Sequence, residues 1–204
     1  MNLERSALIL IGFQNDYFAE DGILHSVVEE SSKVTGVKAN TLRLLESAGE
    51  RFGLVVSTPI FFTEGYTELE DPVGILRTIR DAGAFKAGTR GAQTIEELGR
   101  FSTLIREVPG KRGLNAFSNT ALDGLLREHR IDTVVLAGTV TSICIDSTGR
   151  DAFERGYRVA VLSDCTSGRT VAEQNFYCAE VFPLYAQVLR SDALTGLAAP
   201  AVAA

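Results

Sequence analysis

The sequence predicts one α/β domain built on a mostly parallel sheet that helices cover. Two observations lead to this fold class. Short apolar runs alternate with segments of helical periodicity along residues 1–204, and Gly or Pro punctuates the boundaries. Consecutive parallel strands need a crossover connection, usually a helix, so the alternation favours right-handed βαβ units. A chain of 204 residues is also long enough to bury a substantial core within a single domain.

Six segments are expected to form the strands of this sheet. The first, residues 7–11, is a continuous apolar run of the kind found in central parallel strands. The apolar tail at 198–204 is expected to fray or to pack on a neighbour. The other expected strands are 53–57, 102–108, 132–137, 158–162 and 186–189. Helices are expected over 34–48, 73–80, 119–130, 142–156 and 171–183, with a short helical turn at 94–98.

Composition and charge exclude several function classes. The net charge of −6 and the absence of a Lys/Arg-rich stripe argue against a nucleic-acid partner. No run of about 18 apolar residues is present, so no membrane span is expected, and the first residues lack the order of a signal peptide. The three cysteines form no CxxC pair, which fits reduced thiols in a cytoplasmic protein.

One cysteine stands in a position that favours chemistry. Residues 134–137 read as a buried strand, Gly138 ends it, and Thr141 and Ser142 offer N-cap side chains. Cys144 is therefore expected in the first turn of a helix, at the carboxyl end of a strand. Unpaired N–H groups and the helix dipole favour a thiolate there, which makes Cys144 a candidate nucleophile. The alternative is that Cys144 is simply a small buried hydrophobe.

Four segments together resemble the isochorismatase-like cysteine hydrolases, a family that includes nicotinamidases, carbamoyl amidases and isochorismatase. Residues 7–18, Ala-Leu-Ile-Leu-Ile-Gly-Phe-Gln-Asn-Asp-Tyr-Phe, look like the first-strand motif of that family. Residues 88–92 are similar to its Gly-Thr-x-Gly-Ala segment, and 111–117 to its Lys-x-x-x-Ser-Ala-Phe segment. Residues 138–144 are similar to its nucleophile turn, so the resemblance extends over nearly the whole chain.

The resemblance implies a doubly wound sheet and an Asp–Lys–Cys catalytic triad. Cys144 would attack the carbonyl carbon of a small amide and form a thioester, while Lys111 would hold positive charge beside it. The N–H groups of Thr141 and Cys144 would receive the oxyanion. The family often has a cis peptide bond in this turn, which here would join Val140 and Thr141.

The chain departs from the family pattern at the position of the aspartate, where it has Gly12. Without this aspartate the site loses a general acid–base catalyst, and such catalysis is worth about 10²–10⁴-fold in rate. In one case Cys144 still attacks, stabilised by Lys111 and the helix terminus, and Asp16 or Glu64 supplies the proton. Asp16 has an alternative role as an acceptor of loop N–H groups. In a second case the substrate carries its own acid or base, or the chemistry needs none. In a third case the protein keeps the pocket and has lost hydrolysis.

No metal or other cofactor is expected. The resemblance to nicotinamidases implies an Asp-x-His…His cluster after the second strand, but residues 57–64 contain no histidine. The pocket is expected to be small and partly aromatic, which suits a small planar or apolar acyl compound. At least two of the aromatic residues in its flanking loops are expected to cap the core instead. The expected substrate contacts are Phe13, Tyr17, Phe62 and Val140.

The sequence thus predicts a metal-free cysteine hydrolase that acts on a C–N bond of a small molecule through a thioester on Cys144. A catalytically silent relative that binds a small ligand is the first alternative. An isochorismatase-type vinyl-ether hydrolase is the second, but that chemistry needs an acid, which Gly12 does not provide. The resemblance also implies a homodimer or homotetramer.

Overall fold

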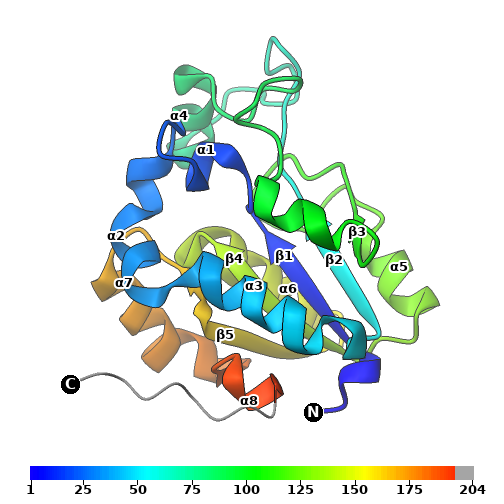
Figure 1. Cartoon of the computed structure of the whole chain (residues 1–204). Coiled ribbons are helices and arrows are strands. Elements are labelled where there is room, and N and C mark those ends of the chain that lie inside the picture. The colour runs from blue at the N-terminus through cyan, green and yellow to red at the C-terminus, as the bar shows by residue number, and fades with distance from the viewer. Residues whose placement is uncertain (196–204) are drawn as a thin grey trace.

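The computed structural model describes residues 1–195, which form a six-stranded sheet between two layers of helices (Figure 1). All neighbouring strands are parallel, in the order β3-β2-β1-β4-β5-β6. This confirms the predicted α/β class with a parallel sheet of six strands. The expected tail at 198–204 lies outside the described residues. The strands are β1 (Ser6–Ile11), β2 (Leu54–Thr58), β3 (Ile105–Glu107), β4 (Thr133–Thr139), β5 (Arg158–Ser167) and β6 (Gln187–Leu189).

The two central strands are buried along their whole length, which explains their unbroken apolar sequences. Successive side chains of a strand point to opposite faces of the sheet. In β1, Ala7, Ile9 and Ile11 therefore join the core cluster on one face, while Leu8 and Leu10 join the cluster on the other.

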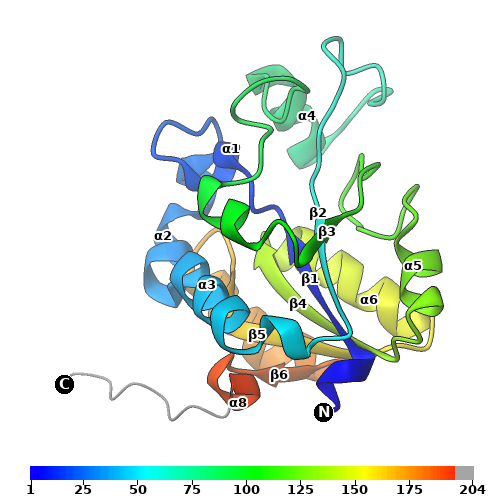
Figure 2. The ribbon, with the colours of Figure 1, turned by 45° about the vertical axis from the view of Figure 1, so that its right-hand side comes forward.

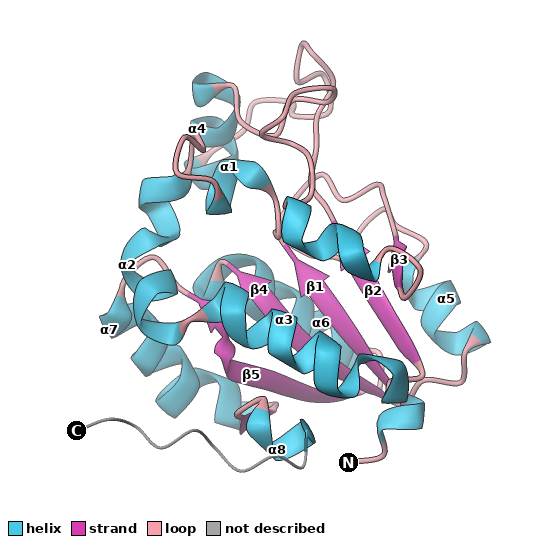
Figure 3. Ribbon diagram, in the orientation of Figure 1, coloured by secondary structure: helices cyan, strands magenta, loops and turns pink. Residues whose placement is uncertain are grey.

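Helices cover both faces, as a doubly wound sheet requires (Figures 2 and 3). On one face, Leu44 of α3 packs into the cluster that contains Leu8. On the other, Leu126 of α5 and Ala152 of α6 pack into the cluster that contains Ile9. The α-helices are α1 (Asn15–Phe18), α2 (His25–Thr35), α3 (Val37–Ala48), α4 (Gly74–Ala82), α5 (Leu122–Glu128), α6 (Asp146–Glu154), α7 (Val171–Phe176) and α8 (Asp192–Thr195). The 3-10 and π-helical segments are η1 (Leu3–Arg5), η2 (Gly49–Arg51), η3 (Glu96–Phe101), η4 (Thr141–Ile145), η5 (Tyr177–Val181) and η6 (Phe182–Leu184).

The structure has a helix, α2, that the sequence did not predict. Only Val28 and Ser31 of α2 are buried, so its sequence carries too few apolar residues to show helical periodicity. The helix expected over 34–48 is also interrupted. Gly36 adopts φ +67°, ends α2 and begins α3, because glycine reaches the left-handed region without steric cost.

Strand β5 is longer than expected. It continues past Leu162, where the expected strand ended, to Ser167, so Asp164 lies within the strand. The pairing with β4 shifts register after Leu136, which absorbs the polar stretch around Asp164 before pairing resumes at Gly138. Two expected helices are each split. The segment 142–156 forms η4 and α6, and 171–183 forms α7, η5 and the start of η6.

The order of the strands places a ligand site between β1 and β4. The chain winds outward from β1 to β3 in one direction and from β4 to β6 in the other, so the order reverses at this pair. Open α/β sheets bind ligands outside the carboxyl ends of their strands at such a reversal. Helix α4 and the loops around it lie beyond this edge of the sheet (Figures 1 and 2). They add a third apolar cluster that includes Phe62, Ile79 and Phe85.

Candidate active site

Three segments meet at the carboxyl edge of the sheet. Gly12 follows β1, and η4 follows β4, whose Gly138 is the register partner of Ile11. Lys111 follows β3 and is held beside β2 by a parallel bridge to Ile60. Residues far apart in the sequence therefore converge where the reversal of strand order predicts a site.

The amine of Lys111 and the sulfur of Cys144 form a buried pair. Lys111 Nζ lies 3.5 Å from Cys144 Sγ and donates a 2.5 Å hydrogen bond to the carbonyl oxygen of Gly113. Lys111 is 1% exposed and Cys144 is 8% exposed. A buried amine needs hydrogen-bond partners, and the Gly113 carbonyl and the Cys144 sulfur supply them.

The turn that carries Cys144 contains a cis peptide bond, but it joins Thr139 and Val140. The expected position, between Val140 and Thr141, was one residue too late. Thr139 is still paired with β5, where its hydroxyl donates to the Ser167 carbonyl, so the chain changes direction directly after this residue. Since η4 begins at Thr141, its first N–H groups have no partner within the helix.

The side chain of Gln174, on α7, holds this turn in place. The Thr141 hydroxyl donates to Gln174 Oε1. The amide of Gln174 donates in turn to the Ser163 carbonyl and to the Thr166 hydroxyl of β5. Gln174 is buried and satisfied on both sides, so it fixes the start of η4 against the sheet. Sequence reasoning missed this residue, because one glutamine on a short helix gives no distinguishing pattern.

At Gly12 the backbone leaves no room for a side chain. Gly12 adopts φ +71°, and a Cβ built there would lie 2.8 Å from the carbonyl oxygen of Thr139. It would also lie 3.2 Å from Cγ2 of Thr139. Residues other than glycine rarely adopt this φ, and the nearest atom is backbone that cannot swing away. Gly12 therefore allows the strand β1 to pass close to the nucleophile turn.

The Gln14-Asn15-Asp16 motif anchors loops. Gln14 Nε2 donates to the carbonyl oxygens of Ile60 and Ala92, at 2.7 Å each, and its Oε1 accepts from the Ile60 N–H. Asn15 donates to the Arg90 carbonyl. The motif thus connects the loop after β1 to the loop after β2 and to the Gly-Thr-Arg-Gly-Ala segment.

The carboxylate of Asp16 takes part in the same anchoring. Asp16 Oδ2 accepts a 2.6 Å hydrogen bond from the Phe85 N–H, and Oδ1 accepts from the Ile23 N–H at 3.4 Å. Asp16 does not line the cavity beside Cys144. Glu64 is exposed and lies 3.9 Å from the Lys86 amine. The geometry thus favours the loop-anchoring alternative for Asp16 and gives neither carboxylate access to Cys144.

A small cavity of about 10 Å³, roughly the space of one water molecule, adjoins Cys144. Tyr17 lines it, and its ring centroid lies 5.0 Å from that of Phe85. Burial raises the pKa of the Tyr17 hydroxyl, and the neighbouring Cys144 and Asp16 raise this pKa further. The remaining lining residues are mostly apolar: Ile11, Gly12, Ile60, Ile75, Leu76, Ile79, Lys111, Gly113, Leu114, Thr139 and Ile143.

The structure brings together only some of the expected substrate contacts. Tyr17 lines the cavity, but Phe13 and Phe62 do not. Phe13 stacks on Phe18 and belongs to the core on the α3 face, while Phe62 packs on Tyr66 in the cluster around α4. Val140 is fully buried in that same cluster. These three side chains pack into apolar clusters and are not among the residues that line the cavity.

Helix α4 supplies a wall of the cavity that the sequence did not reveal. Its Ile75, Leu76 and Ile79 line the same cavity as Cys144. The sequence predicted a helix at 73–80, but helical periodicity alone does not say over which part of the fold a helix lies.

The segment in which nicotinamidases are expected to hold a metal does not fit one here. Residues 57–64 contain no histidine, and Ile60 and Phe62 in this segment are buried apolar side chains. Within the described part of the chain, no group of three or more His, Cys, Asp or Glu side chains could hold a metal ion.

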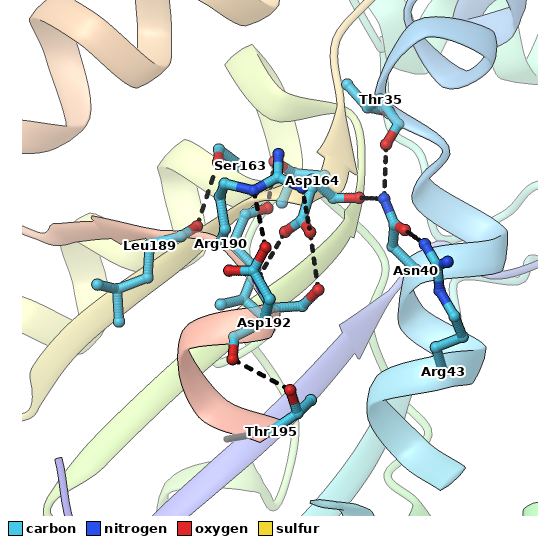
Figure 4. A network of polar contacts seen from close by, with 12 residues as sticks. Thr35, Asn40, Arg43, Ser163, Asp164, Leu189, Arg190, Asp192 and Thr195 are labelled. Atoms are coloured by element: carbon cyan, nitrogen blue, oxygen red, sulfur yellow. Dashed lines mark hydrogen bonds and ion pairs between the residues drawn. The ribbon is translucent and has the colours of Figure 1, made fainter. Parts of the chain in front are cut away.

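A second polar cluster lies around Asp164 (Figure 4), which is not among the residues that line the cavity beside Cys144. Asp164 accepts hydrogen bonds from the N–H and hydroxyl of Ser191, and its carbonyl accepts from the amide of Asn40. These contacts tie β5 to α3 and to the start of α8, so the cluster supports the fold. Beside it, burial raises the pKa of the Cys165 thiol to about 12, and burial raises that of Cys178 to about 11.

Comparison with known proteins finds relatives over nearly the whole chain. A family model described as the isochorismatase domain matches residues 6–193. The ureidoacrylate amidohydrolase RutB of Variovorax paradoxus (strain S110) is 30% identical over 196 residues, covering 87% of this chain and 75% of that protein.

Two solved structures illustrate the similarity in three dimensions. N-carbamoylsarcosine amidase from Thermoplasma acidophilum has a TM-score of 0.71 and 28% identity, with 92% of this chain and 97% of that chain covered. A cysteine hydrolase from Pseudomonas syringae pv. phaseolicola 1448A has a TM-score of 0.78 at 22% identity, with 96% and 93% covered. Because the sequence identity to the Pseudomonas syringae protein is only 22%, this similarity supports the fold alone.

Proposed function

Because the chain belongs to the isochorismatase family, we propose that it is a metal-free cysteine hydrolase that cleaves a C–N bond of a small amide. Amidohydrolases are among its relatives, which supports a hydrolase of the cysteine amidase type. The observation that carries the proposal is the 3.5 Å contact between Lys111 Nζ and Cys144 Sγ at the reversal of strand order.

In the proposed reaction, the Cys144 thiolate attacks the carbonyl carbon and the amine leaves, which gives a thioester that water then hydrolyses. The ammonium of Lys111 stabilises the thiolate electrostatically in a buried site, where charge interactions are strong. The N–H groups of Thr141 and Cys144 are the proposed donors to the oxyanion, at the first turn of η4.

The cavity walls favour an uncharged, mostly apolar acyl group. Lys111 is the one Lys, Arg or His side chain among the lining residues, and it is already engaged by Cys144 and the Gly113 carbonyl. A space of about 10 Å³ is smaller than a substrate, so side chains that line the cavity must move for one to bind.

The two alternatives fit the site less well. A silent binder would not require the amine of Lys111 to be buried against a nucleophile, at a cost in desolvation. A vinyl-ether hydrolase needs an acid that protonates the substrate, and no Asp or Glu is among the residues that line the cavity. The amide reaction is therefore favoured.

The experiment is a panel of small uncharged amides with ammonia or amine release as the readout, combined with mass spectrometry of the intact protein. We expect turnover, with an acyl adduct on Cys144, and no turnover from Cys144→Ala. Cys178→Ala is the matched control, because Cys178 is a half-buried cysteine outside the site. Turnover that survives Cys144→Ala would refute the thioester mechanism.

Two further expectations belong to this proposal. A cytoplasmic location and a homodimer or homotetramer remain predictions, the second of which sedimentation analysis measures directly. No helix among residues 1–195 is both long enough and apolar enough to cross a membrane.

A further inference from the structure

We propose that Lys111 carries the proton in this reaction: its amine takes the thiol proton of Cys144 and its ammonium delivers a proton to the leaving amine. This inference rests on the proposed amide hydrolysis. It goes beyond the electrostatic role given to Lys111 above, because charge alone requires no proton to move.

Few ionisable groups surround Cys144. Only three residues that line the cavity have ionisable side chains: Tyr17, Lys111 and Cys144. Asp16 is bonded to loop N–H groups and does not line the cavity, and Glu64 is exposed. The proton acceptor for the thiol must therefore be Tyr17, Lys111 or a water molecule.

The geometry selects Lys111 among these. Lys111 Nζ lies within hydrogen-bond distance of Cys144 Sγ. Burial also raises the pKa of Tyr17, so the tyrosinate that could accept a proton is disfavoured. In addition, Lys111 and Cys144 line the same cavity, so the amine that contacts the sulfur belongs to a residue beside the space where a substrate would bind.

Position 12, where the carboxylate of an Asp–Lys–Cys triad would stand, supports the same role for Lys111. At φ +71° and with the Thr139 carbonyl 2.8 Å from a built Cβ, this backbone accepts no aspartate without movement. Among residues 1–195 no carboxylate is paired with Lys111, so the amine and the thiol are the two groups between which the proton is proposed to move.

The proton balance closes with these two residues alone. The thiol proton moves to the Lys111 amine, and the thiolate forms the C–S bond. The resulting ammonium protonates the leaving amine as the C–N bond breaks, which restores the neutral lysine. Water then attacks the thioester, giving one proton to Lys111, and this proton returns to the departing thiolate. No oxidant, reductant or further acid is needed.

The test separates charge from proton transfer by replacing Lys111 with arginine, which keeps its charge but does not release a proton. Three rates are measured: alkylation of Cys144 by iodoacetamide, acylation by p-nitrophenyl acetate, and hydrolysis of the best amide from the panel. The ester probe has a leaving group that departs without a proton. Lys38→Arg is the control, because Lys38 is partly exposed and pairs with Glu97.

We expect Lys111→Arg to change alkylation and ester acylation by less than about tenfold, since the charge remains. Amide hydrolysis should fall about 10²–10⁴-fold, the usual contribution of general acid–base catalysis. Amide hydrolysis within about tenfold of the parent would overturn the inference, because charge would then suffice.

A second variant covers the case in which arginine does not fit the buried site. Lys111→Ala should lose amide hydrolysis and regain part of it with added methylamine, in proportion to the free-base concentration. Guanidinium ion, which brings charge but does not act as a base, should not restore it. Equal rescue by both ions, or rescue by neither in protein shown folded by circular dichroism, would overturn the inference.

Failure of the proposed function gives a different pattern. If the parent protein neither forms an acyl adduct at Cys144 nor releases amine from any amide, the hydrolase proposal falls and the role of Lys111 falls with it. If the parent is active and Lys111→Arg is equally active, the hydrolase proposal stands and only the role of Lys111 is refuted.

Discussion

Replacement of Gly12 by alanine tests the geometry that distinguishes this site. A side chain there meets two separate costs. The left-handed backbone at φ +71° costs a non-glycine residue roughly 1–2 kcal/mol. The 2.8 Å approach to the Thr139 carbonyl then forces a backbone shift, which typically costs about 1–3 kcal/mol. We expect Gly12→Ala to lower the free energy of unfolding by about 2–5 kcal/mol.

Gly88→Ala is the matched control, because Gly88 has φ +83° and a Cβ there would meet nothing within 4 Å. Gly88→Ala should lower the free energy of unfolding only by the cost of the left-handed backbone, about 1–2 kcal/mol. Urea denaturation of both variants measures the difference in stability, about 1–3 kcal/mol, and thermal melting should place Gly12→Ala about 2–12 °C below Gly88→Ala. Equal stability of the two would refute the close approach at Gly12. Gly12→Asp should likewise fail to increase amide hydrolysis, and a large gain would contradict both the packing argument and the role of Lys111.

The remaining predictions concern single side chains. Asp16→Asn should cost about 1.5–3 kcal/mol of stability through its bond to the Phe85 N–H and leave the alkylation of Cys144 unchanged; lost turnover in a fully stable protein would instead make Asp16 catalytic. Tyr17→Phe should keep amide hydrolysis within about tenfold, and a loss of about 10²-fold or more would make the Tyr17 hydroxyl the proton carrier. Because burial raises the pKa of Cys165 from 9.0 to about 12, its thiol stays neutral in the folded state after the unfolded chain has begun to ionise. Its contribution to stability is thus complete below pH 9 and is lost as the pH rises from 9 toward 12. Between pH 8 and pH 10, the free energy of unfolding measured with urea should fall less for Cys165→Ala than for the parent protein. An equal fall in both proteins would contradict the raised pKa of Cys165.

The parts of the fold that the sequence predicted are those in which one pattern dominates. The apolar runs of β1 and β4 are typical of buried parallel strands. The motifs that follow these strands indicate the edge of the sheet at which Lys111 and Cys144 are in contact. Helix α2 was not predicted because it buries only two of its residues. The full length of β5 was not predicted because its pairing with β4 resumes only after a polar stretch.

The site was less predictable than the fold, because tertiary contacts decide what a side chain does. Phe13 and Phe62 stand in the right loops, yet they turn into the core. Asp16 stands four residues from Gly12, yet its carboxylate binds the N–H groups of Phe85 and Ile23. No local pattern encodes these contacts, which depend on residues far along the chain.

Competitive alkylation of the native protein at pH 6–7 tests the central claim most directly, with each cysteine located by peptide mass. Exposure alone would favour Cys178, which is half-buried, over the buried Cys144 and Cys165. A thiolate held by Lys111 should reverse this order, so that Cys144 reacts first while the raised pKa values of the other two keep them as thiols. Reaction of Cys178 as fast as Cys144, or faster, would contradict the account.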